Sequence, residues 1–130
     1  MPDPAPVPLS TEESAYFAEG CDLFNNGRFW HAHEAWEEMW KSLKQRKAPE
    51  AEILLVQGLI QTAALLLHHQ RRNTAGVTKQ WQKLAPKLAG WTSMWGLDIE
   101  THLAMVNAYA DDVGTWSLVA ADHQLPQARD

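Results

Sequence analysis

The sequence predicts an all-α fold, a single compact multi-helix bundle of about five helices with antiparallel neighbours and a long central third helix. Apolar residues recur at helical spacing along most of the chain, and we find no alternating strand pattern. The connections between the predicted helices are short, which favours antiparallel packing of neighbours. A length of 130 residues suits one domain with one core.

The domain organisation follows from where this periodicity begins and fades. Four prolines alternate with other residues near the start, so residues 1–10 are expected to form an extended arm. Residues 11–112 carry the helical pattern and are expected to form the bundle domain. The pattern fades beyond Val113, and residues 113–130 are interpreted as a C-terminal tail.

The first two helices have clear start and stop signals. Ser10 and Glu13 form a capping box, which predicts a helix over about 11–24. The polar turn Asn25-Asn26-Gly27 ends it. A second helix is predicted over about 29–44, with an apolar face and a partly charged opposite face.

The third helix is expected to be the centre of the bundle. Pro49 suits its first turn, and the helix should run to about Gln70. It is apolar on nearly every side, as a helix surrounded by others is. Gly58 lies in its interior, where a glycine usually permits close approach of another helix.

Two further helices follow. Asn73 is a candidate N-cap for a fourth helix, which Pro86 should shorten or kink. After the Trp-rich turn 90–96, Asp98 caps a fifth helix that ends at about Ala110.

Composition excludes several classes of function. The formal charge of −5 lacks the basic surface that a nucleic-acid partner requires. The apolar stretch 53–67 is shorter than a membrane span and contains polar residues, so we expect a buried helix and no membrane partner. Cys21 is the single cysteine and no targeting segment is recognisable, which indicates a reducing, cytoplasmic location.

Polar residues on the second and third helices form the candidate functional site. His33 and Glu37 lie one helical turn apart and project from one face. Gln57, Gln61 and His68 share one face of the third helix. Polar groups on a buried helix need partners, so we expect the two stripes to face each other in one pocket.

Three interpretations of this cluster stay open at the level of sequence. A His–Glu–Gln network can simply hold two helices in register. Alternatively, His33, Glu37 and His68 resemble the two-His, one-carboxylate ligand set that suits zinc, manganese or iron, so a divalent metal is a candidate cofactor. The third interpretation is a metal-free site for a small polar ligand, with Trp40, Gln57 and Gln61 as ligand-binding residues.

Catalysis is a further hypothesis for the same residues. In a metal-assisted hydrolase, Glu34 or Glu37 would act as general base on water, while His33 and His68 would bind metal or substrate. His31 and His69 lie off the shared polar stripes and are expected to face solvent. Cys21 lies on an apolar face and is expected to be a small core residue.

Seven tryptophans are many for a chain of this length. The simpler interpretation is a Trp-rich core, and the alternative is a stacking platform for a ligand. Exposed tryptophans would instead favour a helical protein–protein interaction module, which binds another helix or a second copy of the chain as a homo-oligomer.

Several short motifs together resemble a known family. They are Phe24-Asn25-x-Gly-x-Phe-Trp, Ala32-His33-Glu34-x-x-Glu37-x-x-Trp40, Gln57-Gly58-Leu59-Ile60-Gln61-x-Ala63, and His68 followed by Asn73-x-x-Gly76. The combination resembles the bacterial and archaeal family catalogued as domain of unknown function 309, over about residues 17–103.

The resemblance implies a small all-helical protein of uncharacterised activity. By position, it also implies a functional face. The residues concerned are His33, Glu34, Glu37, Trp40, Gln57, Gln61 and His68.

Overall fold

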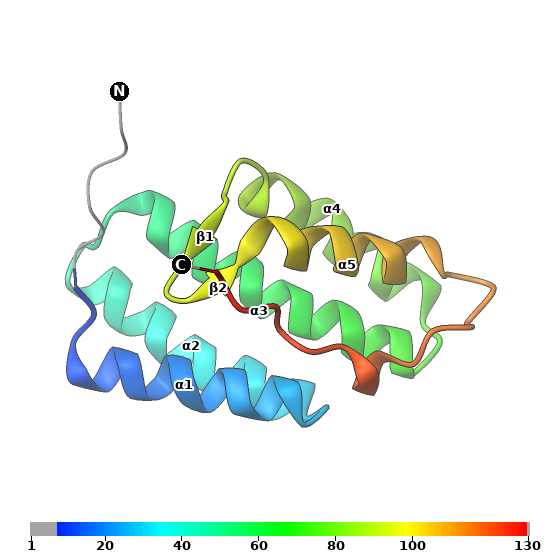
Figure 1. The fold of residues 1–130 in the computed structure, drawn as a ribbon, viewed down its shortest axis with the longest axis horizontal. Helices are drawn as coiled ribbons and strands as arrows, with labels where there is room; N and C mark the ends of the chain where they lie inside the picture. The colour runs from blue at the N-terminus through cyan, green and yellow to red at the C-terminus, as the bar shows by residue number, and fades with distance from the viewer. Residues whose placement is uncertain (1–7, 130) are drawn as a thin grey trace.

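Five α-helices make up most of the protein in a computed structural model that describes residues 8–129 (Figure 1). Their bounds are α1 Thr11–Asn25, α2 Phe29–Gln45, α3 Glu50–Gln70, α4 Thr74–Leu88 and α5 Ile99–Asp111. The predicted all-α bundle of about five helices is therefore confirmed. Most of the expected N-terminal arm, residues 1–7, lies outside the described residues.

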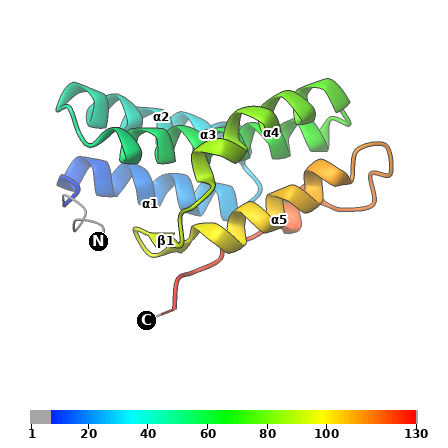
Figure 2. The same ribbon diagram turned by 90° about the horizontal axis from the view of Figure 1, so that it is seen from above.

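The helix α3 is the centre of the arrangement. It packs against α2, α4 and α5, whereas α1 packs mainly on α2. Figure 2 shows α2, α3 and α4 in one layer, with α1 and α5 in a second layer below it. The connections α1–α2, α2–α3 and α3–α4 are short turns, so each pair is antiparallel.

By length and composition, α3 also resembles a membrane span. Its most apolar stretch has a mean hydropathy of 1.5, but 56% of that stretch is buried inside the protein. The neighbouring helices cover the apolar surface that a membrane would otherwise cover.

The core is built from large apolar side chains contributed by all five helices. Trp36 lies at the junction of α1 and α2, where its indole donates to the backbone oxygen of Phe17 at 3.2 Å. Its ring fills the space left by Gly20, since a Cβ atom there would overlap the indole. The largest fully buried side chains are Trp36, Phe24, Phe29, Met39, Leu43, Leu55, Leu59, Leu65, Leu66, Leu84, Leu88 and Ile99.

Gly58 permits the close approach of helices that was expected, and the partner is α4. A Cβ atom at Gly58 would lie 2.7 Å from Cδ2 of Leu88 and 3.2 Å from Cβ of Lys87. The helix α4 continues two residues past Pro86 before it ends at Leu88. Proline at this point therefore lies just before the helix end and does not cut it short.

A small β-hairpin forms most of the Trp-rich turn that the sequence predicts between α4 and α5. Strands β1 (Ser93–Met94) and β2 (Leu97–Asp98) pair antiparallel, with Met94 opposite Leu97. The two residues between them, Trp95 and Gly96, have φ values of 51° and 81°. Two successive positive φ values define a type I′ turn, whose twist suits a two-residue hairpin. The strands are too short for sequence alternation to reveal them.

The segment 113–129, expected to be a tail, packs against the bundle. It contains a short 3₁₀ helix, η1 (Ala120–Asp122), and it buries Ala120, His123 and Leu125. Further along, Leu97 forms a bridge with Gln127, so this segment also extends the hairpin edge. The division of the chain into arm, bundle and tail stays a prediction.

Glu13 ties the start of α1 to the end of α2. It closes the predicted capping box with Ser10, and its side chain is fully buried. Its carboxylate also accepts hydrogen bonds from Ser42 Oγ at 2.6 Å and Arg46 Nε at 2.9 Å. Burial by itself raises the pKa of Glu13, but the hydrogen bonds from Arg46, Ser42 and Ser10 outweigh it and hold the pKa at about 2.

We expect Glu13→Gln to destabilise the protein by about 1.5–3 kcal/mol, because it removes a charge-assisted interaction and leaves Arg46 without its partner. Urea unfolding near neutral pH measures this loss. Glu12→Gln is the matched control, since Glu12 is an exposed neighbour and the change in charge is the same. Equal stability of the two variants would show that the Glu13 interactions contribute no net stability.

A buried chain of three side chains joins α3, α5 and the C-terminal segment. Thr62 Oγ1 donates to the backbone oxygen of Leu59 at 2.7 Å, so it accepts from His102 Nε2 at 3.0 Å. Nδ1 of His102 then carries the lone pair and accepts from His123 Nε2 at 3.0 Å. Both imidazoles are neutral in this arrangement.

The environment of these two imidazoles favours the neutral form. Burial, together with the neighbouring His123, lowers the pKa of His102 to about 3. Burial lowers the pKa of His123 to about 4. Both values lie below the ordinary histidine value of about 6.5, so the unfolded chain binds protons more readily than the folded one.

Their contribution to stability is therefore complete above about pH 6.5 and is lost as the pH falls toward the folded-state values. We expect the free energy of unfolding to drop by about 2 kcal/mol per histidine between about pH 7.5 and about pH 5. Urea unfolding at the two pH values tests this, because most carboxylates stay ionised over this range. His123→Gln should remove about half of the drop, whereas the exposed-site control His31→Gln should leave it unchanged.

Candidate functional site

A polar pocket of about 210 Å³ lies where α2, α3 and α4 meet. The helix α3 contributes its floor, and α2 and α4 contribute opposite walls. The lining residues are His33, Glu37 and Trp40 from α2, Gln57, Ile60, Gln61 and Ala64 from α3, and Gln80 and Lys83 from α4.

Antiparallel packing of α2 on α3 brings the two predicted polar stripes together. The chain reverses between Gln45 and Glu50, so His33 and Glu37 come level with the middle of α3. His33, Glu37, Trp40, Gln57 and Gln61 all line the one pocket.

The α2 wall carries the acidic end of the pocket. His33 Nδ1 lies 3.0 Å from Glu37 Oε1, but the two atoms are not aligned for a hydrogen bond. The side chain of Glu37 is 39% exposed and that of His33 is 23% exposed. On its outer side, the His33 ring stacks on Trp30 with ring centroids 5.3 Å apart. The imidazole is therefore held between an aromatic ring and a carboxylate.

The α4 wall carries the basic end. Lys83 lines the pocket and is exposed. One turn further along, Lys87 donates from Nζ to Gln61 Oε1 at 2.8 Å, so α4 also orients an amide of the floor. Burial, with a smaller contribution from the charge of Lys83, lowers the pKa of Lys87.

Three polar atoms of the pocket residues are buried and lack hydrogen-bond partners within residues 8–129. They are His33 Nδ1, Trp40 Nε1 and Gln80 Oε1. Each such group costs about 1–3 kcal/mol when it stays unpaired. The residues around the pocket therefore carry unused hydrogen-bonding capacity, on atoms that are covered in this conformation.

Sequence reasoning missed the contribution of α4. Gln80 and Lys83 line the pocket, and Lys87 binds its floor. Their spacing of i, i+3 and i+7 places them on one face of a helix, which is the signal that was available.

His68 does not join this pocket, contrary to the sequence prediction. It lies at the last turn of α3, about 10 Å of helix rise beyond Gln61. There it packs against Gly76, and its Nδ1 lies 3.2 Å from Asn73 Nδ2. A shared helix face does not bring residues together when two helical turns separate them along the axis.

The three predicted metal ligands are consequently not brought together in this structure. Within residues 8–129, the structure brings together no group of three His, Cys, Asp or Glu side chains that could hold a metal ion. Of the predicted ligands His33, Glu37 and His68, only the first two are neighbours. The metal-assisted hydrolase hypothesis depends on the same three ligands, so this arrangement does not support it.

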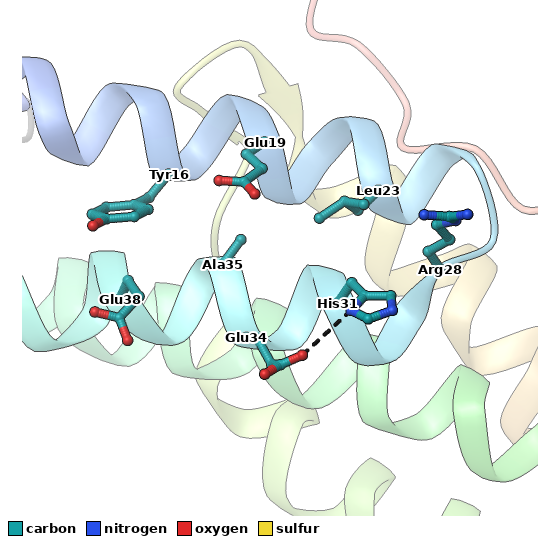
Figure 3. A pocket seen from close by; sticks show the side chains of 8 residues that line it. All are labelled: Tyr16, Glu19, Leu23, Arg28, His31, Glu34, Ala35 and Glu38. Atoms are coloured by element: carbon teal, nitrogen blue, oxygen red, sulfur yellow. Dashed lines mark ion pairs between the residues drawn. The ribbon is translucent and has the colours of Figure 1, made fainter.

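Glu34 is also separated from Glu37, although both were predicted as catalytic carboxylates. It lines a larger groove of about 450 Å³ between α1 and α2, together with Tyr16, Glu19, Leu23, Arg28, His31, Ala35 and Glu38 (Figure 3). Its carboxylate lies 3.4 Å from His31 Nδ1. Glu34 therefore lies on the α1 side of α2, whereas Glu37 lies on the side that faces α3 and α4. His31 is exposed, as expected.

His69 is buried, whereas the sequence prediction placed it in solvent. Its Nε2 lies 2.8 Å from Asp112 Oδ2. Asp112 also accepts hydrogen bonds from Ser117 and from the backbone of Leu118. Burial by itself raises the pKa of Asp112. These hydrogen bonds and the one from His69 outweigh that effect and hold the pKa well below its usual range. The aspartate ties the segment after α5 to α3.

Cys21 is half-buried against the core, in keeping with its expected structural role. Burial, with the charge of Asp22, raises the pKa of its thiol to about 12. The thiol is therefore protonated at neutral pH, and a nucleophilic role is disfavoured.

Fold and pocket together define a small all-helical protein with a polar pocket between three helices of its bundle. Residues 17–80 match the model of the family described as Domain of unknown function (DUF309). This match supports the family that the motif resemblance indicated. The matched segment contains every pocket residue except Lys83. No curated protein and no solved structure matches the chain.

The separation of His33 from His68 has a measurable consequence. We expect the destabilisation by His33→Ala and by His68→Ala to add within about 0.5 kcal/mol in the double variant, because the two side chains share no partner. Urea unfolding of the single and double variants forms the thermodynamic cycle.

His33→Ala with Glu37→Ala is the matched control pair, since these residues are in contact and should show coupling above that limit. If His33 and His68 showed a coupling as large as that of His33 and Glu37, and if added Zn²⁺ increased it, the metal-site hypothesis would be supported again.

Proposed function

We propose that this protein binds a small polar molecule in the pocket between α2, α3 and α4. The observation that carries the proposal is the set of three buried, unpartnered polar atoms on residues that line this single pocket. An unpaired buried group lowers stability, and a ligand that supplies its partner recovers that loss on binding.

The size and lining of the pocket support a small ligand. Its volume of about 210 Å³ lies below the roughly 300–1,000 Å³ typical of sites for drug-sized molecules. Most of its lining side chains are polar, and carboxamides on the floor both donate and accept hydrogen bonds. Such a lining suits a molecule with several polar groups and little apolar surface.

Binding requires a small rearrangement of side chains. The three unpartnered atoms are covered in this conformation. Rotation of the His33 ring, or of the Gln80 amide, brings the hidden atom toward the pocket without movement of the backbone. Both side chains are partly exposed, so room for rotation exists.

The alternative of a helical interaction module has less support. Of the seven tryptophans, all within the described residues, Trp30 is the exposed one, at 55%, and Trp36 is fully buried. The other five are partly buried against neighbouring residues. An isolated exposed aromatic side chain is ordinary on a soluble protein surface.

The cytoplasmic location expected from the single cysteine belongs to the same proposal, since a reducing compartment keeps this thiol free.

Side-chain NMR tests the proposal directly. The protein is titrated separately with acetamide, lactate, ethanolamine and serine, which represent neutral, anionic, cationic and zwitterionic small molecules. We expect at least one of them to shift the indole N–H signal of Trp40 and the amide signals of Gln57 and Gln61, because these groups line the pocket.

The variant Gln57→Leu/Gln80→Leu should weaken that binding about tenfold or more, through loss of two hydrogen-bonding side chains. Gln82→Leu is the control, because Gln82 is exposed on α4 and does not line the pocket. If none of the four compounds moves the pocket signals, or if the control weakens binding equally, the proposal is wrong.

A further inference from the structure

The two walls of the α2–α3–α4 pocket carry opposite charges. Glu37 on α2 is an acceptor with a half-exposed carboxylate, and Lys83 on α4 is an exposed ammonium group. The floor between them is formed by Gln57, Ile60, Gln61 and Ala64 of α3. The helices α2 and α4 flank α3, so the charges belong to opposite sides of one pocket.

Neither charge is neutralised by the other wall. Within residues 8–129, Glu37 has a single basic neighbour within ion-pair distance, the imidazole of His33 on its own helix. Among the described residues, Lys83 has no carboxylate within that distance, and it lies close enough to Lys87 for the two positive charges to interact. The α4 wall therefore carries a positive charge without a carboxylate partner. The α2 wall carries Glu37, and the carboxamides of Gln57 and Gln61 lie on the floor between the two walls.

This arrangement selects by charge as well as by hydrogen bonding. A carboxylate bound at the α4 wall gains a charge-assisted interaction with Lys83, beside the Gln61 amide that Lys87 orients. An ammonium group bound at the α2 wall gains a charge-assisted interaction with the Glu37 carboxylate. After rotation of its ring, His33 can also accept a hydrogen bond from the ammonium group through Nδ1. A singly charged molecule satisfies one wall and leaves the other without a partner.

We propose that the ligand is a small zwitterion of the α-amino-acid type, with its carboxylate toward Lys83 and its ammonium group toward Glu37. This inference rests on the proposed function, because it names the chemical class that the same pocket accepts. The pocket volume of about 210 Å³ limits the ligand to a compact side chain. Larger aromatic amino acids would exceed the room between the walls.

Isothermal titration calorimetry with three matched compounds tests the assignment. L-Serine carries both charges, N-acetyl-L-serine keeps only the carboxylate, and L-serine methyl ester keeps only the ammonium group. We expect serine to bind about tenfold more tightly than either analogue, since each analogue loses one charge-assisted interaction.

Variants then assign each charge to its wall. Glu37→Gln should bring the affinity of serine down to that of N-acetyl-L-serine, and Lys83→Met should bring it down to that of the methyl ester. Glu38→Gln and Lys79→Met change the same charges at exposed positions outside this pocket and should leave serine binding unchanged.

The outcomes separate the two proposals. If an analogue with one charge binds the pocket as tightly as serine, the zwitterion assignment is overturned while the binding function stands. If serine binds preferentially but the Glu37 and Lys83 variants match their controls, the assignment is also overturned. If acetamide, lactate, ethanolamine and serine all leave the Trp40 indole signal unmoved, both proposals fail.

Discussion

The burial of α3 constrains every other element of this protein. This helix is apolar around nearly its whole circumference, so several neighbours are needed to remove it from water. The helices α2 and α4 flank it, α5 covers a further side, and Gly58 lets α4 come close. Gln57, Gln61 and Thr62 interrupt the apolar surface near the middle of the helix. Their hydrogen-bond partners determine where polar groups gather inside the bundle.

The polar side chains in the middle of α3 have two different hydrogen-bonding environments. Thr62 is fully buried and bonds to a neutral histidine pair, which fastens α5 and the C-terminal segment to the bundle. Gln57 and Gln61 face the gap between α2 and α4, where hydrogen bonding is incomplete. One nitrogen of the histidine pair, His123 Nδ1, also has no hydrogen-bond partner among the described residues, but it is enclosed in the core, which suits a structural network. The unpaired atoms around Gln57 and Gln61 instead belong to residues that line a pocket.

Buried ionic groups hold the ends of the bundle. Glu13 joins the start of α1 to the end of α2 through Ser42 and Arg46, and Asp112 joins the segment after α5 to His69. Each carboxylate is almost fully buried and accepts several hydrogen bonds, as a buried charge requires. The pocket between α2, α3 and α4 is thereby placed in a scaffold whose ends are fixed, which favours a preformed site.

The sequence by itself determined the helices, most of their caps and five of the pocket residues. Capping boxes, apolar periodicity and prolines act over a few residues, so Ser10, Asn73 and Asp98 cap the predicted helices in the structure. Antiparallel pairing of α2 with α3 was also predictable from the short connection, and with it the meeting of His33 and Glu37 with Gln61.

Only the tertiary structure decided which polar residues share a site. Helical periodicity fixes the direction of a side chain but not its level along a neighbouring helix, so His68 was wrongly placed with His33. Partners distant in the chain are equally invisible to local patterns. His69 is buried against Asp112, and His102 is buried against His123. Lys83 reaches the pocket because α4 packs closely on α3 at Gly58.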